Sequence, residues 1–84
     1  MNWIKKLIPA YIEIRSLYWV EYGIKMELAL EKIFRSIDEE ELGEAENLIA
    51  KFESTFSQGG VPGWIAIKYS EIYRASSMLA FLKA

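Results

Sequence analysis

The side chains that most often carry catalysis and metal binding are missing from this 84-residue chain, which has 0 cysteines and 0 histidines. Without thiols and imidazoles, the chain has no disulfide, no thiolate nucleophile, no ordinary zinc ligand set and no base that titrates near neutral pH. Carboxylates are left, but a carboxylate metal centre in a helical bundle normally combines Glu with His on facing helices. We therefore expect a non-enzymatic protein without a metal or cofactor.

The carboxylates are concentrated in the middle of the chain. Residues 37–58 carry seven Asp or Glu and one Lys, whereas the whole chain has a formal net charge of −2. An acidic patch is defined by Asp38, Glu39, Glu40, Glu41, Glu44 and Glu46. It could occlude a basic target site, as in a small inhibitor, antitoxin or immunity-type protein. The favoured interpretation is a solvated helix start, because acidic residues stabilise the positive end of the helix dipole.

The basic residues do not form a nucleic-acid footprint. They are scattered along the sequence, and two of them follow a Glu by four residues, in the pairs Glu21 with Lys25 and Glu31 with Arg35. Pairs at this spacing are ordinary helix-surface ion pairs. A nucleic-acid-binding protein needs clustered Lys and Arg instead. We expect no nucleic-acid partner.

Apolar and aromatic residues exceed what a core of this size requires. Hydrophobic residues make up 52% of the chain and aromatic residues 14%, whereas a helical bundle uses about three positions in seven for its core. Surplus apolar surface usually marks an interface, and symmetric dimers are the commonest assemblies. The sequence therefore predicts a protein–protein interaction and oligomerisation module, most simply a homodimer. The predicted interface consists of Tyr18, Trp19, Tyr22, Gly23, Trp64, Tyr69 and Tyr73.

The first helix that must position these residues is long and apolar on two sides. Apolar residues recur at steps of three or four from about residue 10 to 36, which predicts one amphipathic helix. A second apolar stripe on the same helix predicts contact with two neighbours. Pro9 suits the first turn of a helix, so residues 2–8 are expected to form a separate short helix or an extended arm. Gly23 is expected to permit close approach of another backbone, with a kink in the helix as the alternative.

Two further helices complete the predicted fold. Ser36 and Glu39 fit a capping box, which predicts that a second helix spans about 38–57. Three of the five glycines and one of the two prolines lie in residues 57–63, which indicates a helix stop. A third helix is expected at about 64–82. The expected fold is an all-α, three-helix antiparallel bundle, a single domain over residues 1–84 that forms part of an oligomeric helical bundle.

Charges also bear on membranes and localisation. They interrupt every apolar run before it reaches the roughly 20 residues that a spanning helix needs, so we expect no membrane span and a cytoplasmic protein. A weaker alternative is an interfacial membrane anchor formed by Trp3, Ile4, Lys5, Lys6, Leu7 and Ile8. The pattern leaves open whether a small-molecule pocket lies between the helices, because a filled core would use the same aromatic residues.

Overall fold

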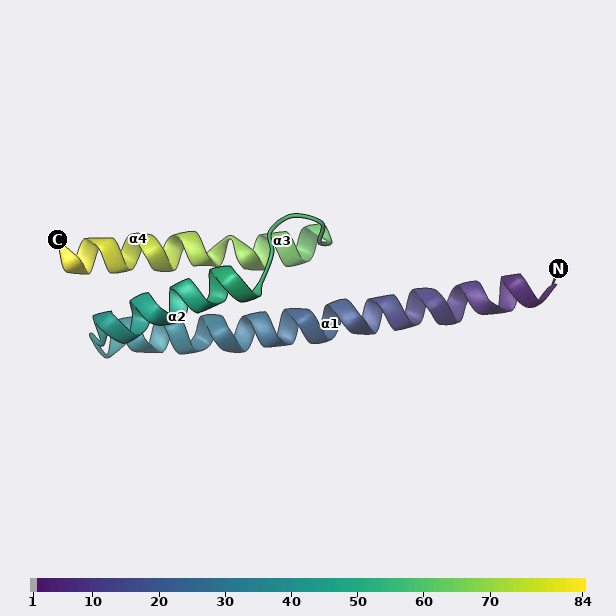
Figure 1. Ribbon diagram of the computed structural model, residues 1–84, viewed down its shortest axis with the longest axis horizontal. Coiled ribbons are helices and arrows are strands. Elements are labelled where there is room, and N and C mark those ends of the chain that lie inside the picture. The colour runs from purple at the N-terminus through teal and green to yellow at the C-terminus, as the bar shows by residue number, and fades with distance from the viewer. Residues whose placement is uncertain (1) are drawn as a thin grey trace.

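The protein is a bundle in which one long helix packs against shorter ones. The computed structural model describes the backbone from Asn2 to Ala84 and the side chains from Leu17 to Ala84. Its helices are α1 (Asn2–Asp38), α2 (Leu42–Thr55), α3 (Gly63–Tyr69) and α4 (Glu71–Lys83). Helix α2 runs antiparallel to α1, and α3 and α4 together form a third, returning layer (Figure 1). The predicted all-α three-helix antiparallel bundle is confirmed.

One apolar core holds the three layers together. From α1, Met26 and Ile33 are fully buried, Phe52 comes from α2, and Ile65 and Ile72 come from α3 and α4. Burial of side chains of this size contributes about 1.5–3 kcal/mol each. The bundle is therefore stabilised mainly by contacts between residues distant in sequence.

Helix α1 begins earlier than predicted. It is one continuous helix of 37 residues from Asn2, and it runs through Pro9, so the predicted start near residue 10 and the separate short helix or arm were wrong. A proline prefers the first turn of a helix, but that preference does not require a helix to begin there. The N-terminal part of α1 consequently extends past α3 and the end of the bundle (Figure 1).

The connection between α1 and α2 also differs from the prediction. Ser36 is a buried residue within α1, and Glu41, which precedes α2, makes no side-chain cap. The N–H of Glu41 donates to the Ser36 carbonyl (2.9 Å) and the N–H of Glu40 to the Ile37 carbonyl (3.0 Å). Glu40 has a φ of 58°, the left-handed conformation of a Schellman helix end. The capping box was wrong because α1 continues through it, and α2 spans Leu42–Thr55 instead of about 38–57.

The third layer is interrupted once. The predicted helix at about 64–82 is divided at Ser70, whose φ and ψ of −60° and −19° remain in the helical region. Its N–H is shared between the carbonyls of Ala66 (3.1 Å) and Ile67 (3.2 Å), and its hydroxyl donates back to Ile67. Such back-bonding by serine commonly bends a helix. Helices α3 and α4 nevertheless continue nearly in line across this residue (Figure 1).

Candidate interaction surface

Aromatic residues from all four helices gather at the end of the bundle where α1 leaves it. A chain of ring contacts, with centroids 4.9–6.3 Å apart, links Tyr18, Trp19, Tyr22, Phe56, Phe52, Tyr69 and Tyr73. The N–H of Ser57 donates to the Tyr22 hydroxyl (2.8 Å), and the Tyr73 hydroxyl donates to Oε1 of Gln58 (2.7 Å). These bonds tie the loop after α2 to α1 and α4.

The predicted interface residues differ in exposure. Tyr18, Trp64 and Tyr73 are exposed, and Trp19 and Tyr22 are half-buried against the core. Tyr69 is a core residue. Its burial raises the pKa of its phenol, and the negative charge of Glu53 raises that pKa further by a smaller amount. A contiguous outward surface therefore cannot include Tyr69.

Gly23 allows a close approach, but by side chains and not by a backbone. A Cβ placed on Gly23 would lie 2.9 Å from Cζ3 of Trp64 and 3.1 Å from Cδ1 of Ile65. The indole of Trp64 and the buried Ile65 thus occupy the space that any larger residue on α1 would need. The expected neighbouring backbone was wrong, because α3 reaches α1 with its bulky side chains at this position.

The acidic patch is divided between two helices and their turn. Asp38 ends α1, Glu39–Glu41 form the turn, and Glu44 and Glu46 lie on α2. Asp38 and Glu39–Glu41 therefore lie close to the negative end of the α1 dipole as well as to the positive end of the α2 dipole. The two dipoles act in opposite directions on these carboxylates, so the carboxylates stabilise the start of α2 less than they would at an isolated helix start. Glu46 is paired with Lys83 of α4 (2.8 Å).

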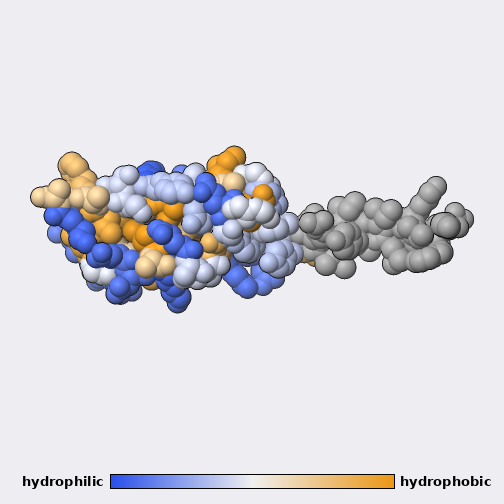
Figure 2. Space-filling model, turned by 45° about the horizontal axis from the view of Figure 1, so that its top comes forward, coloured by the Kyte–Doolittle hydropathy of each residue, from blue (hydrophilic) through white to orange (hydrophobic). Residues whose placement is uncertain are grey.

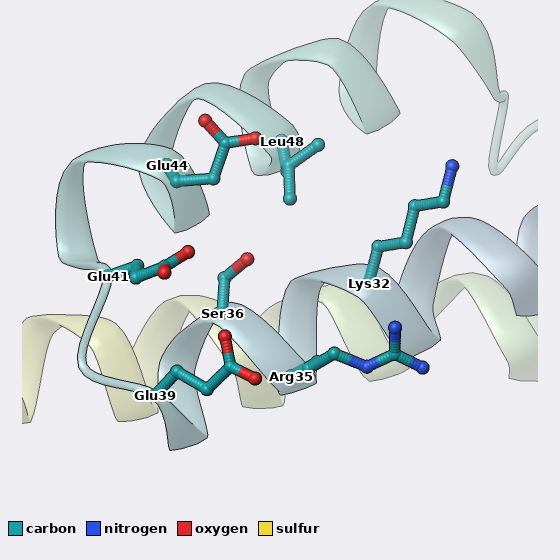
Figure 3. Close-up of a pocket in the computed structure, with 7 residues that line it drawn as sticks. All are labelled: Lys32, Arg35, Ser36, Glu39, Glu41, Glu44 and Leu48. Carbon is teal, nitrogen blue, oxygen red and sulfur yellow. The ribbon is translucent and has the colours of Figure 1, made fainter.

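A shallow hollow beside this turn mixes acidic and basic groups. It encloses about 530 Å³ and is lined by Lys32, Arg35, Ser36, Glu39, Glu41, Glu44 and Leu48. Figure 3 shows the carboxylates on the turn and α2 side and the two basic side chains on the α1 side. Three carboxylates and two basic groups largely cancel, which makes this surface a weak electrostatic match for a strongly basic target.

An exposed apolar face lies on the outer side of α1. Leu17, Ile24 and Leu28 are 60%, 53% and 54% exposed, and Val20 beside them is also exposed. At 100° per residue these positions lie about opposite Met26 and Ile33, which face the core. We call Leu17, Ile24 and Leu28 the outer stripe. The predicted interface did not include the outer stripe, although the spacing of seven and four residues between its members is visible in the sequence.

A second apolar region lies at the C-terminal end of α4. Met78, Phe81 and Leu82 are exposed there, with Phe81 82% exposed, and with Ser77 they line an open hollow of about 320 Å³. Figure 2 shows apolar side chains reaching the bundle surface among hydrophilic ones. This region spans residues 77–82, whereas the exposed apolar residues on α1 span residues 17–28.

A groove between α1 and α2 has an apolar floor and a basic rim. It encloses about 260 Å³, its floor includes Leu28, Phe52 and Phe56, and Lys25, Lys32 and Lys51 also line it. A hollow between helices is therefore present in the described part of the chain, which bears on the question of a pocket that the sequence left open.

The membrane and metal predictions concern the N-terminal segment, the helices and the carboxylates. The Trp3–Ile8 segment proposed as a membrane anchor lies outside the residues with described side chains. None of the described helices has the length and apolarity needed to cross a bilayer. Over the described side chains, no three Asp or Glu residues come together as a metal ion would require.

Comparison with known proteins adds no relative. No family model matches the chain, and no curated protein or solved structure is significantly similar to it. Functional inference therefore depends on the surface described above.

Proposed function

We propose that this protein is a non-enzymatic helical interaction module that acts by associating with other protein chains, in the first place with copies of itself. The observation that carries the proposal is the two-sided α1: one side forms the bundle core, and the other exposes Leu17, Ile24 and Leu28 to solvent. Exposed apolar side chains aligned on one helix face are typical of protein interfaces.

The fold around α1 supports the same function. Helix α1 spans 37 residues, whereas α2 spans 14, so much of α1 has no bundle neighbour (Figure 1). A long helix without a packing partner is marginally stable in water. Association of this helix with another chain would supply the missing contacts.

The alternative of an acidic inhibitor has weaker support. Its residues are exposed, but the adjacent Lys32 and Arg35 reduce their net charge, and Glu46 is held by Lys83. Steering of a basic partner requires a surface dominated by one sign of charge. The apolar face of α1 therefore supports an interaction role better than the acidic patch does.

Sedimentation equilibrium tests the proposal directly. With the full chain measured from low micromolar to submillimolar concentration, we expect a mass that rises above the 9.7 kDa of one chain. A mass that stays at 9.7 kDa throughout would overturn self-association.

A further inference from the structure

Resting on the proposed function, we infer that two copies of this protein pair through the outer side of α1 as an antiparallel coiled coil. The first observation is that Leu17, Ile24 and Leu28 are exposed on the side of α1 opposite the core. They are separated by seven and four residues, which is the heptad spacing of a coiled-coil seam. Leu28, at one end of this stripe, also lines the groove between α1 and α2.

The sequence extends this spacing far beyond the three described residues. Counting back from Leu28 in alternating steps of four and three gives Ile24, Glu21, Leu17, Ile14, Ala10, Leu7 and Trp3. All of these positions except Glu21 are apolar, and all lie within α1. The repeat covers nearly four heptads, or about 39 Å of helix, which reaches the length that distinguishes a coiled-coil repeat from chance.

The repeat is also self-complementary when reversed. If residue 14 of one chain faces residue 17 of its partner, residue 7 faces Ile24, residue 3 faces Leu28 and residue 10 faces Glu21. Apolar positions then meet apolar positions of the second copy at 3 and 28, 7 and 24, and 14 and 17, whereas Ala10 meets Glu21. The register that buries the stripe therefore follows from the sequence itself, and the matching partner is a second copy of this chain.

Glu21 determines the direction of pairing. In a parallel pair it would face Glu21 of the other copy inside the seam, where like charges repel and are costly to desolvate. In the antiparallel pair it faces the small Ala10, and its carboxylate can keep its ion pair with Lys25, which measures 3.2 Å. The same register places position 6, a lysine, next to Glu27 of the second copy, whose carboxylate also pairs with Lys68 of its own chain at 3.4 Å, so opposite charges flank the seam.

Engineered cysteines can test this arrangement without competing disulfides from native residues, because the chain has 0 cysteines. The Leu7→Cys chain is mixed with an isotope-labelled Ile24→Cys chain, reduced, and then oxidised, and the disulfide products are identified by mass spectrometry. Positions 7 and 24 are about 25 Å apart along a parallel pair but adjacent in the antiparallel pair, and a disulfide requires Cα atoms within about 7 Å. We expect the mixed disulfide to be the main product, and Ile24→Cys alone to stay largely unlinked.

A matched control and the sedimentation result separate the possible failures. Leu7→Cys mixed with Phe81→Cys should give no more mixed disulfide than chance collision, since Phe81 is exposed at the far end of α4. If Ile24→Cys links to itself instead, the pairing is parallel and the inference is overturned. If no link forms although the chain sediments as a dimer, another face mediates association, and the inference fails while the proposed function stands. A chain that stays monomeric contradicts both.

Discussion

The two faces of α1 use the same residue types for different purposes. Ile33 on the inner face is 0% exposed, within a core built from all three layers, whereas Ile24 on the outer face is 53% exposed. Hydropathy alone cannot separate these two isoleucines. The difference shows that the bundle fixes only half of the apolar pattern of this helix, and that the other half is available for association.

The largest expected effect comes from truncating each isoleucine in turn. Ile33→Ala should destabilise the fold by about 2–5 kcal/mol, because it removes buried methyl groups and leaves a cavity. Ile24→Ala should change the free energy of unfolding of the monomer by no more than about 0.5 kcal/mol. Urea denaturation of both variants, at a concentration low enough to keep the chain monomeric, measures the contrast.

Equal losses in the two variants would contradict the comparison. That result would mean that Ile24 is buried within the monomer. A loss of unfolding free energy in Ile24→Ala that grows with protein concentration would support the difference between the two faces, because only the associated form would bury the Ile24 side chain.

A substitution at Glu21 should strengthen association. Glu21→Leu completes the outer stripe, and the added apolar burial should tighten self-association about tenfold or more. The lost ion pair with Lys25 is exposed, with side-chain exposures of 70% and 66%, so it offsets little of this gain. The dissociation constant from sedimentation equilibrium measures the change.

Glu21→Gln is the control for pairing direction. It removes the charge without adding an apolar side chain. In the antiparallel pair Glu21 faces Ala10, so Glu21→Gln should associate nearly as the wild type does. A clear strengthening by Gln would indicate that two Glu21 side chains face each other, as in a parallel pair.

The smallest expected effect concerns the turn that joins α1 to α2. Glu40 occupies the left-handed conformation, with a φ of 58°, which costs a residue with a Cβ about 1 kcal/mol or more relative to glycine. Glu40→Gly should therefore raise the free energy of unfolding by about 0.5–1 kcal/mol, in spite of glycine's greater freedom in the unfolded chain. It should leave self-association unchanged, and a weakened association would mean that the turn takes part in the interface.

The sequence predicted the fold because each helix has a clear apolar period. The glycine-rich loop over residues 57–63 separates α2 from α3, as expected. The helix ends were less predictable. Glu40 shows why: a glutamate in a Schellman turn is uncommon, so Ser36 was interpreted as a start signal for α2 although α1 continues through it.

The candidate surface was only partly predictable. Most of the aromatic residues in the predicted interface contact one another at one end of the bundle, but composition could not show that Tyr69 is buried there and Tyr18 exposed. Which side of α1 faces the core depends on contacts with α2, α3 and α4, which are distant in sequence. The outer stripe could therefore be assigned only after the inner side was known.

A comparison of two charge insertions tests most directly whether α1's outer face mediates association. Ile24→Glu and Phe81→Glu both introduce a carboxylate at an exposed apolar position, one on α1 and one at the end of α4. Sedimentation equilibrium should show that Ile24→Glu weakens self-association by about a hundredfold or more, since two carboxylates enter the apolar seam of each dimer, while Phe81→Glu associates as the wild type does. Loss of association in Phe81→Glu with wild-type behaviour of Ile24→Glu would contradict this account and assign the interface to α4.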